Sequence, residues 1–434
     1  MTRQFRSVAI GLLALSGAAS LTLRSSAQVL RPGISAAKAS ETRLRDLAPA
    51  TPESVGMSSE RLKRLDAAIK HLVDEKQLAG LVTLVERHGK IVDFNAVGKL
   101  DVRKPDPIQK DSIFRLYSMT KPVTGVAMML LYEEGKWQLD DPVTRYIPEF
   151  AHLMVSSGKN PDGSPKLEEM RRPMTMRELM THTAGVNGYP ANVYHAGSPL
   201  QATIDGLAKV PLVAQPGTRW LYSMVVDVQG YLIEKFSGQS FADFARTRIF
   251  EPLGMKDTGF YVPKEKLTRL AQIHTGSGSS LAYTPPATYV DLNWPDPTVP
   301  PLGPSGSGGL YSTAMDYARF CEMMLQGGQL NGVRVLAPRT VEMMRTNYVN
   351  PVALKTMPAG TGWGMDFQIV MDAAATGDSV SDGTFSWWGF AGTWFWIDPV
   401  SDLAFVGMVQ HQSLGTTRAI HALSRSLVYQ AIME

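Results

Sequence analysis

The stretch IFRLYSMTKPVTGVAMMLL, residues 113–131, organises the rest of the chain. A strand-like run ends at Tyr117, and the apolar run that follows is typical of a helix buried in the centre of a domain. Between the two runs, Ser118 and Lys121 share one face of the first helical turn, with Cβ atoms about 5–6 Å apart. A lysine amine so placed can take or relay the serine hydroxyl proton. The helix N-terminus lies where negative charge develops during acyl transfer.

The Ser-x-x-Lys pattern alone is weak evidence, because it occurs three times in this chain. Ser35–Lys38 lies in a small-residue stretch near the N-terminus, and Ser156–Lys159 lies in a polar stretch rich in Gly, Asn and Asp. Only Ser118 has a strand pattern before it and a buried helix pattern after it. We therefore predict Ser118 as the nucleophile, against the alternative of a helix cap beside a solvated lysine.

Length and composition indicate a globular protein. The 434 residues suffice for two ordinary domains or one large composite domain, and 44% are hydrophobic and 19% charged. Cys321 is the single cysteine, so an intrachain disulfide is excluded. We find no HExxH or clustered Cys/His pattern, and we predict neither a metal nor another cofactor.

Residues 1–27 have the features of a secretory signal. Arg3 and Arg6 precede an apolar segment, and small residues lead to a predicted cleavage site near Ala27. An uncleaved N-terminal anchor is the alternative. Removal of this segment, with Arg24, leaves 40 of the 43 basic residues against 40 acidic ones. That balance gives no sign of nucleic-acid binding, and we expect a periplasmic or secreted protein without stable membrane insertion.

Hydrophobic periodicity places strands at both ends of the chain. We predict a linker over residues 28–52, a helix over 58–75 and two strands over 81–86 and 91–96. The Ser118 helix follows. Near the C-terminus we predict a hairpin over 393–409 and a last helix over 416–433. From about residue 139 to 303 the strand patterns fade and helical patterns prevail.

This distribution predicts an α/β (α+β) fold with an antiparallel sheet flanked by helices. Residues 53–135 and 304–434 would form the sheet domain, and residues 136–303 an inserted all-helical domain. The Pro-rich stretch from Thr284 to Pro304 is expected to be a lid or pocket wall.

A serine nucleophile also needs a proton acceptor and an oxyanion hole. Lys121 is one candidate base, and Tyr222 is the best second one, because the turn at Pro216-Gly-Thr would present it at the start of a helix. A tyrosinate beside a lysine can accept the serine proton. The alternative role for any of the 14 tyrosines is packing.

The chain resembles the serine β-lactamase/DD-peptidase superfamily and, within it, the class C-like family VIII carboxylesterases. The resemblance runs from about residue 53 to 430. It rests on seven segments: FRLYSMTKP at 114–122, LMTHTAG at 179–185, PGT at 216–218, YS at 222–223, PLGM at 252–255, GGLYST at 308–313 and WWGFAGT at 387–393.

The resemblance implies a role for each matching residue. Ser118 matches the nucleophile, Lys121 the general base and Tyr222 the second-motif tyrosine, while His182 matches a structural position. Trp387, Trp388 and Gly389 replace the third motif and would bind substrate. Backbone N–H groups of Ser118 and Phe390 would form the oxyanion hole.

Two departures separate the chain from β-lactamases of this type. Met224 stands where they have an asparagine, and Trp387 where they have a lysine that attracts the substrate carboxylate. An anionic β-lactam would lose a charge-assisted hydrogen bond worth about 1.5–3 kcal/mol, whereas an uncharged ester would lose little. Trp388 stands where these esterases often have glycine, which would narrow the site.

The sequence therefore predicts a serine carboxylesterase that acts on short- to medium-chain esters. A β-lactamase, a D-amino-acid peptidase and an acyltransferase remain alternatives. A penicillin-binding-type sensor that no longer turns over is an alternative of another class.

Overall fold

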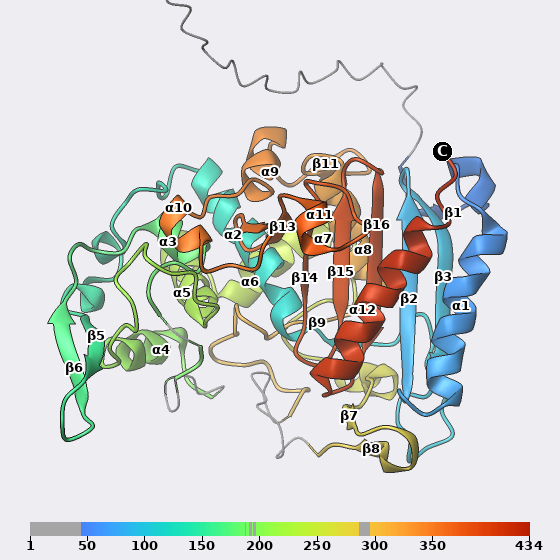
Figure 1. Cartoon of the computed structure of the whole chain (residues 1–434), viewed down its shortest axis with the longest axis horizontal. Helices are drawn as coiled ribbons and strands as arrows, with labels where there is room; N and C mark the ends of the chain where they lie inside the picture. The colour runs from blue at the N-terminus through green and yellow to red at the C-terminus, as the bar shows by residue number, and fades with distance from the viewer. Residues whose placement is uncertain (1–44, 187, 191–192, 194–196, 286–295) are drawn as a thin grey trace, which may run out of the picture. The chain divides into compact units, whose positions relative to one another are not determined.

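A sheet of eight strands carries the fold, with the order β1-β3-β2-β16-β15-β14-β13-β12 (Figure 1). The computed structural model describes residues 45–186, 188–190, 193, 197–285 and 296–434. The strands are Ala48–Pro49 (β1), Gly80–Arg87 (β2), Lys90–Gly98 (β3), Thr361–Trp363 (β12), Gln368–Val370 (β13), Phe385–Trp388 (β14), Trp394–Asp398 (β15) and Leu403–Val409 (β16). All are antiparallel to their neighbours except β1, which runs parallel to β3.

Strands from the N-terminal and C-terminal parts of the described chain pair in the centre of this sheet. β2 pairs with β16 in a register that sets Leu81 opposite Val409 and Arg87 opposite Leu403. Every residue of both strands is buried, which explains why they read as nearly continuous apolar runs. Gly407 on β16 is required, because a Cβ there would lie 2.4 Å from the ring of Trp394. The predicted sheet from both termini is therefore observed.

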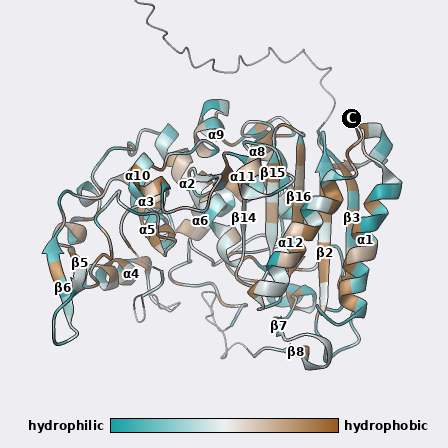
Figure 2. Ribbon diagram, viewed as in Figure 1, coloured by the Kyte–Doolittle hydropathy of each residue, from teal (hydrophilic) through white to brown (hydrophobic). Residues whose placement is uncertain are grey.

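Helices cover both faces of the sheet. α1 (Ser59–Asp74) and α12 (Leu414–Tyr429) pack on one face, against residues such as Trp396 and Phe405. α2 (Thr120–Glu133) and α8 (Ala314–Leu325) share a cluster with residues of the opposite face, such as Leu84 and Val406. Figure 2 shows both hydrophilic and hydrophobic residues along α1, as expected for a helix with one buried side. The predicted mixed fold of sheet and flanking helices is confirmed.

The middle of the chain is not purely helical. It holds α3 (Met176–Met180), α4 (Leu200–Leu207), α5 (Val225–Ser237) and α6 (Phe241–Ala245), but also a hairpin of β5 (Met154–Lys159) and β6 (Pro165–Glu169). The hairpin was not predicted, because most of its side chains are exposed and show no alternation. It contains Ser156–Lys159, the second Ser-x-x-Lys, which lies on a strand and not at a helix N-terminus.

Short elements complete the described residues. They are α7 (Glu251–Leu253), α9 (Pro338–Met344), α10 (Pro351–Leu354), α11 (Ala373–Thr376), and the strand pairs β4 (Phe114–Arg115) with β9 (Tyr311–Ser312), β7 (His274–Thr275) with β8 (Ala282–Tyr283) and β10 (Gln329–Leu330) with β11 (Val333–Arg334).

Part of the predicted linker belongs to the folded body. β1 lies within it, Leu47 is buried, and Arg45 forms ion pairs with Glu322 of α8 and Asp402 of the β15–β16 turn. The sequence does not predict that segment 45–52 is folded, because the residues that bind it, such as Glu322 and Asp402, lie far away in the sequence. The predicted signal, the first Ser-x-x-Lys and residues 286–295 of the predicted lid lie outside the described residues. The part of the chain described here has no helix long and apolar enough to span a membrane.

Candidate active site

Ser118 lies on a sharp turn between a strand and a helix. β4 ends at Arg115, a single 3₁₀ turn covers Tyr117–Met119, and α2 begins at Thr120. Tyr117 has φ of 47°, in the left-handed region that a bulky residue rarely adopts. This strained backbone directly precedes the serine that the sequence singles out, and Ser118 remains partly exposed at the surface of the pocket described below.

Lys121 is fully buried in the first turn of α2 and points its amine at three oxygen atoms. Nζ lies 3.3 Å from Ser118 Oγ, 2.9 Å from the hydroxyl of Tyr189 and 2.8 Å from the carbonyl oxygen of Ser307. Three acceptors match the three donors of an ammonium group. Burial acts to lower the pKa of Lys121, but the neighbouring Tyr189 and Tyr222 outweigh it and the pKa is raised above its ordinary value.

Tyr222 lies where the sequence predicts it, immediately before α5. Its hydroxyl accepts a hydrogen bond of 3.1 Å from Nε1 of Trp387 on β14. Lys121 Nζ lies 4.6 Å from the centroid of its ring. Tyr222 is therefore in contact with both the predicted base and the predicted third motif.

His182 packs against the ring of Tyr222 and binds the backbone of the next residue. The two ring centroids are 5.0 Å apart, and His182 Nδ1 accepts a hydrogen bond of 3.3 Å from the backbone N–H of Ser223. Burial, and secondarily the charge of Lys121, lowers the pKa of His182 well below its ordinary value. A neutral packing histidine agrees with the structural role expected for it.

Tyr189 is the residue of the site that sequence reasoning missed. Its hydroxyl is the phenolic oxygen hydrogen-bonded to Lys121, and burial raises its pKa. It follows the LMTHTAG segment by four residues, but one tyrosine among 14 carries no local signal of its own. Only tertiary packing brings it to Lys121.

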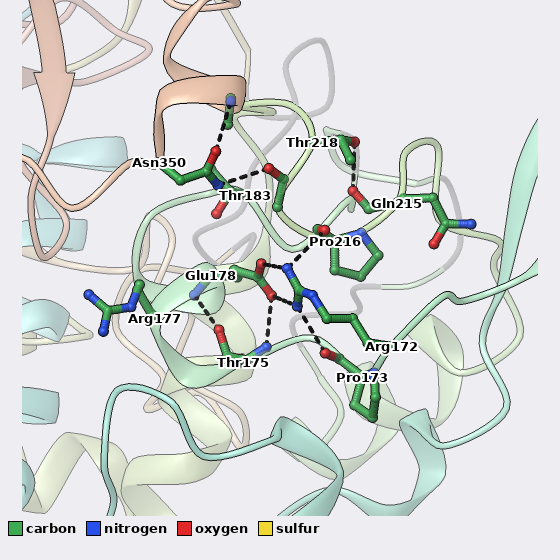
Figure 3. A network of polar contacts seen from close by, with 12 residues as sticks. Arg172, Pro173, Thr175, Arg177, Glu178, Thr183, Gln215, Pro216, Thr218 and Asn350 are labelled. Carbon is green, nitrogen blue, oxygen red and sulfur yellow. Dashed lines mark hydrogen bonds and ion pairs between the residues drawn. The ribbon is translucent and has the colours of Figure 1, made fainter. Parts of the chain in front are cut away.

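A polar network holds the two loops that carry His182 and Tyr222 (Figure 3). Thr175 and Glu178 form a capping box at the start of α3, and Glu178 also pairs with Arg172. The backbone N–H of Gly217 donates to the carbonyl oxygen of Thr183 at 2.8 Å. The turn that leads to Tyr222 is thereby joined to the segment after α3.

The β14–β15 turn is joined directly to the nucleophile turn. Thr393 Oγ1 donates to the carbonyl oxygen of Leu116 at 3.1 Å, and Gly389 N–H donates to the carbonyl oxygen of Thr393 at 2.7 Å. A Cβ on Gly389 would lie 2.3 Å from the Leu116 oxygen, so glycine is required there. Phe390 directly follows Gly389, and both Phe390 and Ser118 line the pocket described below.

A pocket of about 240 Å³ opens over Ser118, and six aromatic side chains form the rest of its wall. Trp387 is buried, whereas 42% of the Phe390 surface is exposed at the mouth. The guanidinium of Arg418 lies 5.6 Å from the ring centroid of Trp388. The lining residues are Tyr117, Ser118, Tyr189, Tyr222, Trp387, Trp388 and Phe390. Among the described residues, no group of three His, Cys, Asp or Glu side chains is placed to hold a metal ion.

Comparison with known proteins gives this arrangement a family. A family model described as Beta-lactamase matches residues 65–430. The chain belongs to the beta-lactamase family. An uncharacterized protein of Mycobacterium tuberculosis is 34% identical over 367 residues, which cover 80% of this chain and 89% of that protein.

Two further proteins to which the chain is similar are an esterase and a hydrolase by name. Esterase EstB of Burkholderia gladioli is 28% identical over 399 residues, covering 84% of this chain and 94% of EstB. The solved structure of EstCE1, a hydrolase with promiscuous acyltransferase activity, aligns with a TM-score of 0.73 and 26% identity over 85% of this chain and 99% of EstCE1. These relatives confirm the resemblance to β-lactamase-related esterases, and the chain is a serine hydrolase.

Proposed function

We propose that this protein is a carboxylesterase that hydrolyses short- to medium-chain esters through an acyl-enzyme on Ser118. The observation that carries the proposal is the bond from Trp387 Nε1 to Tyr222 inside an aromatic pocket. A neutral indole occupies the place where a cation would attract an anionic substrate, and no charged side chain is among the described residues that line the pocket.

The proposed reaction proceeds in two steps. Lys121 and Tyr222 accept the Ser118 proton as Oγ attacks the ester carbonyl carbon, and the N–H groups of Ser118 and Phe390 stabilise the oxyanion. The proton passes to the departing alcohol when the C–O bond breaks. Water, activated by the same pair, then attacks the acyl-enzyme, and the acid leaves with Ser118 restored.

Hydrolysis of p-nitrophenyl butyrate by the full chain, beside Ser118→Ala, tests this function. We expect rapid turnover by the unaltered protein and a rate near background for the variant. Full activity in Ser118→Ala would contradict the assignment of the nucleophile. The Ser156→Ala variant is the matched control, because that serine begins a Ser-x-x-Lys on an exposed strand and its loss should leave the rate unchanged.

Three other assays distinguish the alternatives. Turnover of nitrocefin above that of the ester would favour a β-lactamase or peptidase, and ester formation with an added alcohol would favour an acyltransferase. A stable acyl adduct on Ser118, seen by mass spectrometry without turnover, would favour a sensor. EstB and EstCE1, by the names they carry, support the hydrolase.

A further inference from the structure

Two buried carboxyl groups lie near Lys121, and neither belongs to the reaction proposed above. Asp227 is in the first turn of α5, and Asp366 is in the loop between β12 and β13. Both side chains are completely buried, and both interact electrostatically with Lys121. A buried carboxyl group is costly unless it is neutral or well paired, so each needs a physical explanation.

Asp227 is linked to Lys121 through the turn that contains Ser305 and Ser307. One oxygen of Asp227 accepts two hydrogen bonds, from Ser305 Oγ at 2.7 Å and from the backbone N–H of Ser307 at 3.0 Å. The carbonyl oxygen of Ser307 in turn accepts the 2.8 Å bond from Lys121 Nζ. The carboxylate thus fixes the residue that holds the amine.

Asp366 is bound much more weakly. Its Oδ1 accepts one long bond of 3.3 Å from Gln229, whereas the Oδ1 of Asp227 accepts two shorter ones; the Oδ2 atoms of both residues have no hydrogen-bond partner among the described residues. Burial raises the pKa of Asp366 well above its ordinary value. Burial also raises the pKa of Asp227, but there Ser305, Ser307 and Lys121 act in the opposite direction and favour the carboxylate.

Tyr189, Tyr222 and His182 are the other titratable groups close to Lys121, and the two tyrosines act to raise its pKa. Burial raises the pKa of Tyr189 and lowers that of His182, so both stay neutral near pH 7. Tyr222 contacts Lys121 through its ring. Of the two buried carboxyl groups near this ammonium, Asp227 therefore has the hydrogen bonds that better support a negative charge.

We propose that Asp227 is a positioning residue whose carboxylate holds the Ser305–Ser307 turn and supplies the counter-charge that keeps Lys121 protonated, which leaves Tyr222 to accept the Ser118 proton. This inference rests on the function proposed above. It assigns different roles to the two bases of that reaction, Lys121 and Tyr222. Lys121 then acts as a fixed cation beside the ring of Tyr222.

The test compares Asp227→Asn with Asp366→Asn, two isosteric changes of buried carboxyl groups near one lysine. For each variant and the unaltered full chain, the rate of Ser118 labelling by a fluorophosphonate and kcat/KM for p-nitrophenyl butyrate are measured from pH 5 to 10. Loss of the Asp227 charge should lower the pKa of Lys121, so the basic limb of the Asp227→Asn profile should move to lower pH by about one unit. The Asp366→Asn profile should not move.

Two results would overturn the inference: an Asp227→Asn rate that falls equally at every pH, or equal displacement in both variants. Failure of the esterase function is distinguishable, because labelling reports Ser118 reactivity even if the ester is not turned over. If Asp227→Asn does not fold, Ser305→Ala takes its place. It removes one donor to the carboxylate, which weakens the counter-charge, and should move the profile in the same direction by a smaller amount. An unmoved Ser305→Ala profile would equally contradict the proposal.

Discussion

At the scale of single residues, the hydrogen bond from Trp387 to Tyr222 distinguishes this site from one in which a lysine takes the place of Trp387. An indole N–H can stabilise a phenolate without presenting a positive charge to the substrate. Lys121 Nζ lies 4.6 Å from the centroid of the same ring, so Tyr222 has a neutral donor at its hydroxyl and a cation close to its ring.

Trp387→Phe should lower kcat/KM for p-nitrophenyl butyrate by up to about tenfold, because one hydrogen bond contributes about 0.5–1.5 kcal/mol. Trp363→Phe is the matched control. Its ring packs 4.6 Å from that of Trp387, but its Nε1 has no partner among the described residues. Equal losses in both variants would show that only packing matters.

Trp388 should set the upper limit of acyl-chain length. The pocket volume of about 240 Å³ lies below the roughly 300–1,000 Å³ of common ligand pockets, and Trp388 forms part of its wall. Trp388→Gly should raise the ratio of p-nitrophenyl octanoate to butyrate hydrolysis several-fold, and Trp388→Phe should change it less. A ratio that stays the same in the glycine variant would remove Trp388 from the determinants of specificity.

At the scale of elements, α3 and the turn at 215–218 act together to place the walls of the site. Glu178 links the two elements. It caps α3 and pairs with Arg172, and the Arg172 guanidinium also donates to the carbonyl oxygen of Pro216 (Figure 3). The Glu178 side chain is almost completely buried, so its loss leaves several donors without acceptors.

Glu178→Ala should reduce the free energy of unfolding by about 1–3 kcal/mol, measured by urea denaturation, through loss of the cap and of the buried acceptor. Activity should fall as well, because Tyr222 follows the loosened turn. Arg177→Ala is a neighbouring control on the same helix. Its partner Asp140 is mostly exposed, so that ion pair should contribute no more than about 1 kcal/mol. A larger effect of Arg177→Ala would contradict the role given to Glu178.

Local patterns made some elements predictable and concealed others. The nucleophile turn, the buried α2 and the terminal strands follow from spacing and apolar runs within short stretches. Tyr189, Asp227 and the anchor at Arg45 could not be predicted, since each acts through a partner distant in sequence. The β5–β6 hairpin was missed because a strand exposed on both faces has no periodicity that identifies it.

At the scale of the whole molecule, Arg45 joins the start of the described chain to the body. Its guanidinium pairs with Asp402 and with Glu322, whose side chain is fully buried, and Glu86 is a second buried carboxyl group beside them. Burial acts to raise the pKa of Asp402, but Arg45 and His88 outweigh it and hold that pKa below its ordinary value.

Arg45→Met should lower the free energy of unfolding by about 3–5 kcal/mol near pH 7, because it leaves buried charge without a partner. In the unaltered protein the Asp402 contribution is present above about pH 4, the ordinary pKa of an aspartate, and is lost as pH falls through its lower folded-state value. The loss caused by Arg45→Met should therefore shrink in acid. Arg103→Met, at a half-exposed ion pair, should cost far less. Thermal unfolding at several pH values measures both, and a loss that does not change with pH would contradict the linkage.

The pairing of strands from the N-terminal and C-terminal parts of the described chain also has a use in protein engineering. Ser58 N–H donates to the carbonyl oxygen of Ala431, and Met433 N–H donates to that of Gly56, so the segments near both ends lie in contact. The tip of the β5–β6 hairpin, near Asp162, is exposed, and no residue of the hairpin is among the described residues that line the pocket. A circular permutant, with residues 434 and 45 joined by a flexible linker and new termini at that tip, should keep the sheet and the pocket intact. Its new ends would offer a place to attach a fusion partner away from the nucleophile.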